Sequence, residues 1–290
     1  MDNKFSPSWI EMRQAYDMQA RSGLLIEYLS TVSKTQKINL LDLYCGSGSF
    51  LAWLIKNNIN YKKYVLVDYD TKLLKKIKKN IRSVIKPSHK IRSNTNNLDL
   101  IIKKNEDTVS KVEIKKNDCN KYKHNNDKYH LISFSAVLDL MSKSTINNLL
   151  KKVQSDCPLY LSLCFNGKVK WTPSNTMDKY ILSFFNNHQR SDKGFGLALG
   201  SKSIEYISNK ANKADLTVTI KNAPWVIKNL SEKDKIFMKR YILDTKKSLF
   251  HMEGIDRNIL KLWHEQKKYE IENKKISLYV GHNDILIQQK

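Results

Sequence analysis

"LLDLYCGSGSF", residues 40–50, is the most informative segment of this chain. An apolar run ends in an acid, Asp42, and a short turn with Gly46 and Gly48 leads into a segment of helical pattern, 49–57. A buried strand followed by a tight turn and a helix is the repeating unit of a parallel α/β sheet. Glycine in such a turn lets a ligand approach the backbone, and the next helix presents free N–H groups. The segment therefore predicts a ligand site beyond the first strand.

Strand and helix patterns alternate on both sides of this segment. Apolar or alternating runs predict strands, and amphipathic runs predict helices. The alternation favours a doubly wound, mostly parallel α/β sheet with right-handed crossovers. The expected strands are 38–44, 64–68, 111–118, 130–140 and 158–165, and the expected helices are 8–32, 49–57, 72–92 and 143–154. Beyond residue 165 we expect a helix at 201–213, a strand at 215–221, mainly helix over 230–268, and a closing strand or strand pair at 275–288.

Composition excludes several classes of protein. A chain of 290 residues with 41% hydrophobic residues can bury a substantial core. No apolar run approaches the roughly 18 to 20 residues that a membrane helix needs, and the N-terminus lacks the pattern of a secretion signal. The 4 cysteines show neither zinc-site spacing nor the density of a disulfide framework. We therefore expect a reduced, cytoplasmic protein without a metal site or a membrane partner.

The net charge of +23 raises the question of a nucleic-acid partner, because phosphate attracts lysine and arginine. Only seven of the 51 basic residues are arginine, however, and the lysines are spread along the chain. In the densest run, 72–92, the apolar residues share one side of a helix, so its lysines fit a solvated face. Nucleic-acid binding is possible but not favoured.

Acids follow the first three predicted strands. Asp42, Asp68 and Asp118 each come at or near a strand's carboxyl end, where ligands bind in open parallel sheets. Asp68 is placed to accept both hydroxyls of a ribose, and Asp118 to receive an adenine amino group. Any one of them alone could simply begin a turn. The segment is not a dinucleotide fingerprint, since the third glycine would fall on Leu51.

Taken together, "LLDLYCGSGSF", "YVLVDYD", "EIKKNDC" and "YHLISFSAVLDLMS" resemble the successive motifs of class I S-adenosylmethionine-dependent methyltransferases, over residues 38–165. The resemblance implies a Rossmann-like seven-stranded sheet whose last strand is antiparallel, and S-adenosyl-L-methionine as cofactor. It implies that Asp42, Gly46 and Gly48 cradle the methionine part, that Asp68 holds the ribose with Tyr69 against the adenine, that Asp118 and Cys119 border the adenine, and that Ser135 lies near the sulfonium. Tyr44 replaces the first glycine of the usual turn, so the loop is expected to be bulkier.

We expect one domain over 1–290, in four parts. Residues 1–35 would form an N-terminal helical cover and 36–165 the cofactor-binding core. Residues 166–200 would form a substrate lid or insert, and 201–290 the C-terminal helices and closing strands. In the first part Arg13, Asp17 and Arg21 share a helix face. Arg21 is placed to meet the methionine carboxylate, although a plain intrahelical ion-pair ladder is the favoured explanation of the spacing.

The methyl acceptor is less well defined by sequence. "SFSAVLDL" lacks the prolines of amino-group methyltransferases that act on adenine, cytosine or glutamine. RNA carbon-5 uridine methyltransferases have a similar glycine turn and attack with a cysteine, and Cys164 is the candidate, but their other elements are missing. The run "SAVLDLMSKSTINNLLKKV" instead resembles methyltransferases of small molecules, so a small-molecule acceptor is favoured and RNA base methylation is the alternative.

The glycine-rich stretch "FFNNHQRSDKGFGLALG" would lie above that acceptor. His188 is the candidate general base, since its usual pKa lies near neutrality. Arg190 and Lys193 could pair with an acidic acceptor, and Gly194, Gly196 and Gly200 would let the stretch fold as a lid. The alternative is a surface loop with a solvated histidine.

Overall fold

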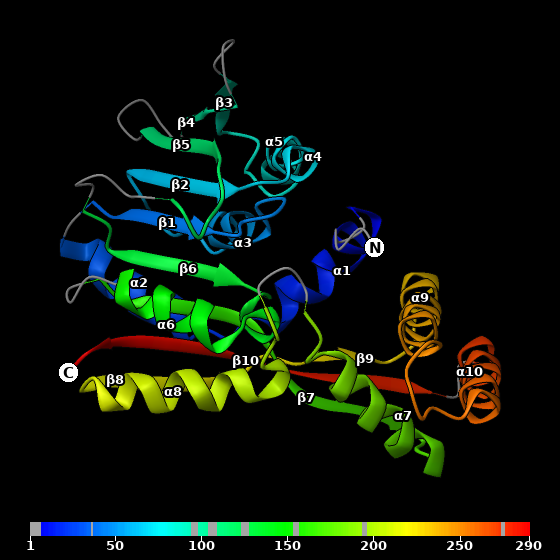
Figure 1. Ribbon diagram of the computed structural model, residues 1–290. Helices are drawn as coiled ribbons and strands as arrows, with labels where there is room; N and C mark the ends of the chain where they lie inside the picture. Colours follow the sequence, from blue (N-terminus) through cyan, green and yellow to red (C-terminus); the bar gives the residue numbers. More distant parts are fainter. Residues whose placement is uncertain are drawn as a thin grey trace.

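The computed structural model describes residues 7–35, 37–93, 98–103, 109–122, 128–152, 157–192, 196–273 and 276–290 (Figure 1). Strands and helices alternate at first as the sequence predicts, but four strands over 90–135 then follow one another with no helix between them in the described residues. The elements are α1 (Pro7–Ala20), α2 (Leu24–Thr35), β1 (Asn39–Leu43), α3 (Ser49–Lys56), β2 (Lys63–Asp68), α4 (Thr71–Leu74), α5 (Ile77–Arg82), β3 (Lys90–Ser93), β4 (Leu100–Lys103), β5 (Val109–Lys116), β6 (Leu131–Ser135), η1 (Leu138–Leu140), α6 (Lys143–Lys152), β7 (Leu159–Thr172), α7 (Thr176–His188), η2 (Gly200–Lys202), α8 (Ser203–Lys213), β8 (Leu216–Asn222), β9 (Trp225–Ile227), α9 (Glu232–Leu249), α10 (Arg257–Glu272) and β10 (Ser277–Gln289).

One mixed sheet runs through the molecule in the order β3-β4-β5-β2-β1-β6-β7-β10-β8, with β9 paired to β10. Strands β5, β2, β1, β6 and β7 are parallel neighbours. The last strand, β10, is antiparallel to β7, β8 and β9, and β4 is antiparallel to β3 and β5. All strands except β4 and β10 therefore point the same way. This is the mostly parallel, Rossmann-like sheet expected from sequence, with ten strands where seven were predicted.

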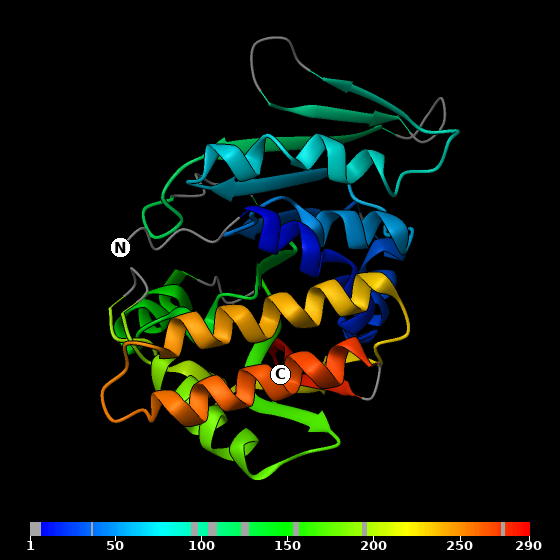
Figure 2. The same ribbon diagram turned by 90° about the vertical axis from the view of Figure 1, so that its right-hand side faces the viewer.

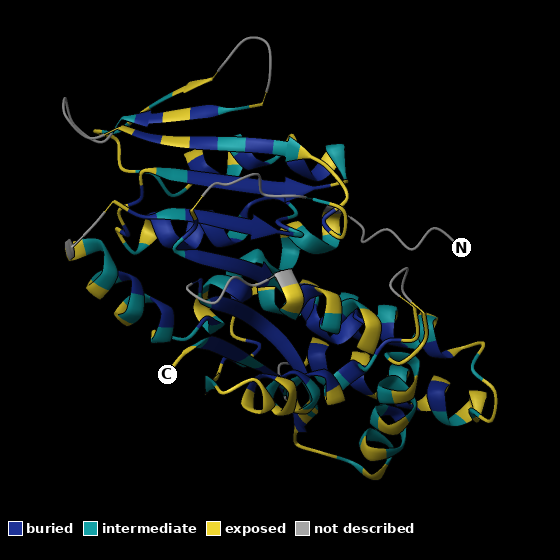
Figure 3. Cartoon of the chain, turned by 60° about the vertical axis from the view of Figure 1, so that its left-hand side comes forward, coloured by how far each residue is buried: buried dark blue, intermediate teal, exposed yellow. Residues whose placement is uncertain are grey.

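Helices cover both faces of this sheet. On one face α2, α3 and α5 bury Leu25, Phe50 and Ile77 against the strands. On the other face α6 and α8 bury Ile146 and Ile207. Figure 3 shows the central strands buried and the β3–β4 edge more exposed. The near-continuous apolar runs of β1 and β2 follow from this burial on both faces.

Strands β7 and β10 are much longer than their neighbours. Their extended parts, with β9, α7, α9 and α10 packed against them, form a second packing region that we call the extended region. The two strands span 14 and 13 residues and pair from Leu159–Ile287 to Thr172–Ser277. A third apolar cluster, including Trp171, Trp225 and Trp263, joins α1, α7, α9 and α10 to β9 and to these extended strands. Figure 2 shows α9 and α10 lying side by side across this region. None of the helices in the described part of the chain is long and apolar enough to cross a membrane.

The N-terminal segment is two helices rather than the single helix predicted over 8–32. The chain turns at residues 21–23 between α1 and α2. There the backbone N–H of Ser22 donates to Asp284 Oδ2 of β10 at 2.7 Å. A buried N–H needs a partner, and this one comes from the other end of the chain, so local sequence patterns do not reveal the break.

The basic run 72–92 also differs from the single helix expected. It forms the short helices α4 and α5, and its end starts strand β3 at Lys90. The apolar residues of α4 and α5 are buried, whereas the lysines of the run are exposed or half-buried. Lys76 and Lys79 both pair with Glu11 of α1 at 3.1 Å. The lysine-rich face is therefore a solvated helix surface, and Glu11 of α1 partly neutralises its charge.

Candidate ligand-binding site

A cleft opens beyond the carboxyl ends of β1, β2 and β6 and against Leu163 within β7. Helix α1 lies at this end of the strands (Figure 1). The cleft holds about 950 Å³ of empty space with its mouth included. Its walls come from α1, from the turns after β1, β2 and β6, and from Leu163 of β7. This is where a doubly wound sheet places ligands.

Three residues in the cleft wall have left-handed backbone without being glycine. They are Tyr44 after β1, Ala136 after β6 and Leu163 in β7, with φ of 54°, 55° and 55°. Each such residue costs roughly 1–2 kcal/mol, and such strain clusters at functional sites. Hydrogen bonds hold all three: Ala136 N donates to Ser162 O at 2.8 Å, Leu163 N to Asp284 Oδ1 at 2.9 Å, and Tyr44 N to Cys119 Sγ at 3.1 Å.

The glycine turn forms the floor of the cleft between β1 and α3. Gly46 and Gly48 have φ of 53° and 73°. A Cβ on Gly48 would lie 3.2 Å from Ile77 Cγ1, so α5 packs directly against this turn. Asn80 Nδ2 also donates to Ser47 O at 2.8 Å. Glycine is therefore required at residue 48 both by backbone conformation and by the close approach of α5.

Asp68 is the carboxylate at the end of β2, and it faces the cleft as predicted. Its Oδ2 accepts from Gly46 N and its Oδ1 from Asp70 N, both at 2.9 Å. Burial raises the pKa of Asp68, and these backbone hydrogen bonds oppose the shift. Each oxygen retains capacity to accept a further hydrogen bond. Tyr69 beside it lines the cleft and is 51% exposed.

Arg21 approaches the same cleft from the end of α1. Its side chain is 6% exposed, and Nη2 donates to Ser135 Oγ at 3.1 Å and more weakly to Ser49 Oγ at 3.4 Å. Within the described residues, Nε and Nη1 of Arg21 are buried and have no hydrogen-bond partner. Leaving a buried cation incompletely bonded is costly. Arg21 is therefore set to receive an anionic group, and it takes no part in the ion pair that Arg13 forms with Asp17 at 2.8 Å.

Asp42 lies beneath the glycine turn and does not line the cleft. Ser133 Oγ donates to Asp42 Oδ1 at 2.8 Å. Burial raises the pKa of Asp42 to about 7, while the Ser133 hydrogen bond and the charge of Arg21 oppose this shift. Asp42 therefore supports the turn from below, and its predicted contact with the cofactor would be indirect.

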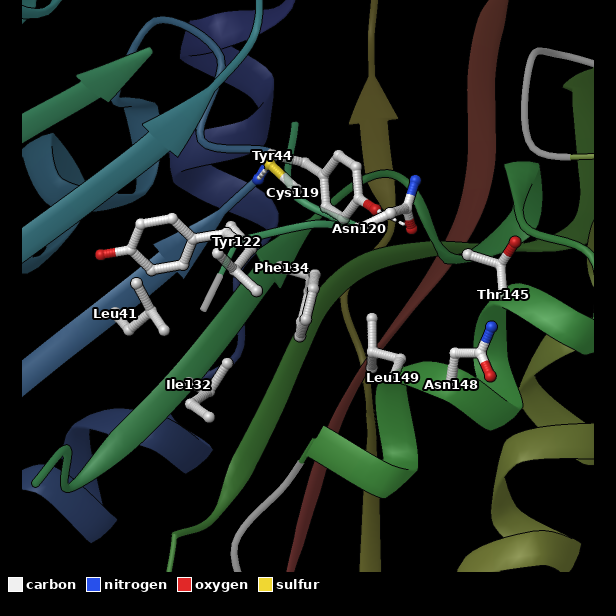
Figure 4. A pocket seen from close by; sticks show the side chains of 11 residues that line it. Leu41, Tyr44, Cys119, Asn120, Tyr122, Ile132, Phe134, Thr145, Asn148 and Leu149 are labelled. Carbon is white, nitrogen blue, oxygen red and sulfur yellow. Dashed lines mark hydrogen bonds between the residues drawn. The ribbon is translucent and has the colours of Figure 1, made fainter. Parts of the chain in front are cut away.

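Asp118 and Cys119 do not line the cleft. Cys119 is buried in a small apolar pocket between β1, β6 and α6, whose lining Figure 4 shows. Tyr44 lines both this pocket and the cleft, and its hydroxyl bonds to Asn120 Oδ1 at 2.9 Å. Asp118 is exposed and accepts from Asn120 N at 2.9 Å. The structure thus brings Arg21, Tyr44, Gly46, Asp68, Tyr69 and Ser135 together in one cleft, but not Asp118 and Cys119.

A second, larger cavity adjoins the cleft. It holds about 1810 Å³ of empty space with its mouth included. Arg13, Ala136, Leu140 and Leu163 line both spaces and so form their shared wall. The other walls come from the extended region: Phe165 of β7, Phe185 of α7, Trp225 of β9, Tyr241 of α9 and His282 of β10. Two spaces that share a wall can hold two reactants side by side.

His188, the predicted general base, lines this second cavity from the end of α7. The predicted lid is partly regular structure, since residues 166–172 continue β7 and 176–188 form α7. Arg190 is exposed and does not line the cavity. Lys193 and Gly194 lie outside the described residues.

Cys164, the candidate nucleophile for RNA methylation, is a core residue. It is 1% exposed in the cluster under α6 and α8. Burial raises the pKa of its thiol well above the usual value, and the nearby carboxylates of Asp139 and Asp284 add to the shift. Because the thiolate is the reactive form, Cys164 is not a nucleophile in this structure.

Among the residues that line the cleft or the second cavity, Arg13, Asp17 and Asp139 were not assigned to a site from sequence. Arg13 lines both, and Asp17 holds Arg13 and accepts from Trp225 Nε1 at 3.0 Å. Asp139 is buried in the wall of the second cavity. The regular spacing of Arg13, Asp17 and Arg21 was a usable signal, whereas Asp139 in "SAVLDL" resembles any acid at the end of an apolar run.

The cleft therefore offers carboxylates at the end of β2 and a guanidinium at the end of α1, on either side of a glycine turn. This arrangement suits an elongated ligand with hydroxyl groups at one end and an anionic group at the other. The adjoining cavity suits an apolar or aromatic second ligand. Within the described residues no group of three or more His, Cys, Asp or Glu side chains could hold a metal ion.

Comparison with known proteins gives structural similarities only. No protein-family model and no curated protein sequence matches the chain. A SAM-dependent methyltransferase from Thiobacillus denitrificans in complex with S-adenosyl-L-homocysteine aligns over 99% of this chain and 100% of its own, at 10% identity and a TM-score of 0.46. A SAM-dependent methyltransferase from Geobacter sulfurreducens with the same ligand aligns over 99% of both chains, at 11% identity and 0.47. The plantazolicin methyltransferase BpumL in complex with SAH aligns over 98% of this chain and 88% of its own, at 11% identity and 0.44.

Proposed function

We propose that this protein transfers a methyl group from S-adenosylmethionine to a small-molecule acceptor. The observation that carries the proposal is the guanidinium of Arg21, which is buried in the same cleft as Asp68 and has two nitrogen atoms without a hydrogen-bond partner among the described residues. A nucleoside that bears an amino acid satisfies both residues at once. The ordered motifs of residues 38–165 independently favour the same ligand.

The cleft fits this methyl donor part by part. Asp68 would accept hydrogen bonds from the ribose hydroxyls, and Arg21 would pair with the methionine carboxylate. The turn from Gly46 to Gly48 would lie against the methionine chain, with Asp42 supporting it from below. Ser135, fixed by Arg21 and by a 2.8 Å contact with Ser162 Oγ, would lie near the sulfonium. Tyr69, Asp118 and Cys119 remain the residues predicted near the adenine.

The second cavity would hold the acceptor. S-Adenosylmethionine supplies an activated methyl group, and the protein's task is to align the acceptor and exclude water. The shared wall of Arg13, Ala136, Leu140 and Leu163 is where the two ligands would meet. His188, at the end of α7, is one candidate for accepting the acceptor's proton.

A small molecule is favoured over RNA because the acceptor cavity is built from helices and strands of the extended region. Trp9, Phe185 and Tyr241 line it with aromatic side chains from three helices. The RNA alternative also loses its nucleophile, since Cys164 is buried with a raised pKa. We further propose that the chain works as a single domain in the cytoplasm, which its unpaired, buried cysteines support.

Methyl-labelled S-adenosylmethionine tests this function directly. The purified protein is incubated with the labelled donor and a cell extract, which is then separated into small-molecule, protein and RNA fractions. We expect label in the small-molecule fraction and none there with Asp68→Ala. Label that accumulates in RNA, or no transfer to any fraction, would contradict the proposal.

A further inference from the structure

Asp139 is a buried acid that the fold does not explain. It lies in η1 directly before Leu140, which lines both the cleft and the acceptor cavity. Its side chain is 8% exposed and lines the acceptor cavity. Asp139 is therefore next in the chain to a residue of the shared wall, where the methyl group would be transferred under the proposed function.

Two other interior carboxylates, Asp284 and the half-buried Asp178, have several partners each, whereas Asp42 keeps one buried oxygen, Oδ2, without a hydrogen-bond partner among the described residues. Asp284 accepts hydrogen bonds from Ser22 N, Tyr160 Oη and Leu163 N. Asp178 accepts from Trp263 Nε1 and pairs with Lys267 Nζ at 3.1 Å. Among the described residues, by contrast, no side chain donates a hydrogen bond to Asp139, and the only interaction beyond its own backbone N–H that favours its charged form is the charge of Arg13. A buried acid without partners is destabilising unless it serves a ligand.

On the basis of the proposed methyl-transfer function, we propose that Asp139 is the general base of the reaction. Its carboxylate would accept the proton of an aromatic acceptor's hydroxyl or amino group. The acceptor's oxygen or nitrogen forms a bond to the methyl carbon, the carbon–sulfur bond breaks, and its electron pair stays on sulfur. The proton passes to the carboxylate of Asp139, which returns it to water after product release.

The chemistry of the cavity agrees with this assignment. Aromatic rings from five elements line it: Trp9, Phe165, Phe185, Trp225 and Tyr241. Arg13 is fixed against this wall, with its guanidinium carbon 5.2 Å from the Trp225 ring centre. Burial raises the pKa of Asp139 to about 6, which suits a base that works near neutral pH.

Other titratable or charged groups surround the same space and could also respond to pH. They are Arg13 of α1, Cys164 of β7 beneath the turn, His188 of α7, Arg240, Tyr241, Asp244 and Lys247 of α9, and His282 of β10. Arg240 and Asp244 pair with each other at 2.6 Å. Burial lowers the pKa of His282 to about 4, so it is neutral at physiological pH. His188 is therefore the base to compare with Asp139.

The first test uses 4-nitrophenol as a chromogenic probe with the full-length protein. Binding is followed by quenching of tryptophan fluorescence, since Trp9 and Trp225 line the cavity. The absorbance of the bound probe then gives its apparent pKa. A carboxylate facing the hydroxyl opposes formation of a second negative charge, so this pKa should be at least about one unit higher in the wild type than in Asp139→Asn. Equal values in the two proteins, or no binding to the wild type, would overturn the proposal.

The second test uses whichever phenol or aromatic amine is methylated. Asp139→Asn should lower kcat by about 100-fold or more and leave binding of S-adenosylhomocysteine unchanged. His188→Asn should change kcat only a few-fold, and Asp215→Asn, an exposed remote acid, not at all. A large loss in His188→Asn with little change in Asp139→Asn would assign the base to His188. Failure of the wild type to bind S-adenosylhomocysteine would refute the methyltransferase function separately, because the probe titration does not depend on the donor.

Discussion

Arg21 couples the N-terminal helix to the candidate donor site. Its neighbour Ser22 is anchored to Asp284, and its guanidinium is bonded to Ser135 on β6. This fixed position leaves Nε and Nη1 buried without a partner in the described part of the chain. A bound carboxylate explains the arrangement better than a surface ion-pair ladder, because only Arg13 and Asp17 form such a pair.

Replacing Arg21 should therefore weaken only ligands that carry a carboxylate. In Arg21→Gln we expect affinity for S-adenosylhomocysteine to fall about 10- to 100-fold, as for loss of a hydrogen-bonded charge pair. Affinity for 5′-methylthioadenosine, which lacks the amino-acid part, should be unchanged. Calorimetric titration of both ligands measures this, with Arg190→Gln as an exposed arginine control. Equal losses for both ligands would mean that Arg21 only supports the fold.

Asp139 should destabilise the protein where it is charged. Because burial raises its pKa to about 6, folding favours its neutral form, and this contribution is lost as pH rises through that value. Asp139→Asn has no carboxyl group to titrate there. The difference in unfolding free energy between the variant and the wild type should therefore change by about 3 kcal/mol in the variant's favour from pH 4 to pH 8. Urea unfolding of both proteins at the two pH values measures the difference. Asp42 titrates in both proteins, so its contribution cancels in the difference between them. A pH-independent difference would show that Asp139 is not desolvated.

The three strand-end acids show what sequence can and cannot predict at this scale. Their position at strand ends predicts that all three lie at the same end of the parallel strands, and of the three only Asp68 lines the cleft among the described residues. Asp42 was assigned the same kind of role but lies beneath the turn, bonded to Ser133. Asp118 bonds to its own loop. Sequence position fixes which end of a strand a residue occupies, but not whether its side chain points into the cleft or away from it.

Among the elements, the turn between β1 and α3 depends on close packing against α5. Gly48→Ala would introduce a left-handed alanine and a Cβ only 3.2 Å from Ile77 Cγ1. We expect a loss of stability of about 1–2 kcal/mol from the backbone alone, with a further loss from displacement of α5. Gly254→Ala is the matched control, since its φ of 76° is similar but its Cβ would meet no atom within 4 Å. Thermal unfolding should rank Gly48→Ala as the less stable variant, and the reverse order would contradict this packing.

Asp284 joins three elements around the cleft. It holds the α1–α2 connection through Ser22, the strained Leu163 of β7, and the hydroxyl of Tyr160. Asp284→Ala should cost about 3 kcal/mol or more, because it leaves buried donors unsatisfied. It should also weaken binding of S-adenosylhomocysteine, because Leu163 and Ser22, the neighbour of Arg21, both lose their hydrogen bond to Asp284. Tyr160→Phe removes only one of these bonds and should keep full affinity. A folded Asp284→Ala protein with wild-type affinity would refute the coupling.

Elements were predictable where the pattern was local. Apolar periodicity predicted the five parallel strands β1, β2, β5, β6 and β7 and the helices α3 and α6, and the structure has them near the predicted positions. The helix predicted over 72–92 is instead two short helices followed by the start of β3. The break between α1 and α2 was missed because its cause, the bond from Ser22 to Asp284, spans almost the whole chain. The continuation of β7 to Thr172 was also missed. Its second half pairs with the first half of β10, and such distant partners leave no local signal.

At the scale of the whole molecule, the extended region explains why the chain is longer than its sheet core requires. β7 and β10 project past the cleft, and α7, α9 and α10 pack around them (Figures 1 and 2). Of these elements, β7, β10, α7 and α9 line the second cavity beside the cleft. Under the proposed function, the same core sheet would serve another acceptor if this region changed, because the cleft and the second cavity are built from different parts of the chain.

Calorimetric titration with S-adenosylhomocysteine tests the central claim, that the cleft binds the methyl donor, most directly. We expect the wild type to bind one equivalent with a Kd on the order of micromolar. Asp68→Ala should weaken binding by at least about tenfold, because the ribose hydroxyls lose a charged acceptor, and Asp215→Asn should bind normally. No heat and no thermal shift with the wild type, or unchanged affinity in Asp68→Ala, would contradict the assignment of this cleft to the methyl donor.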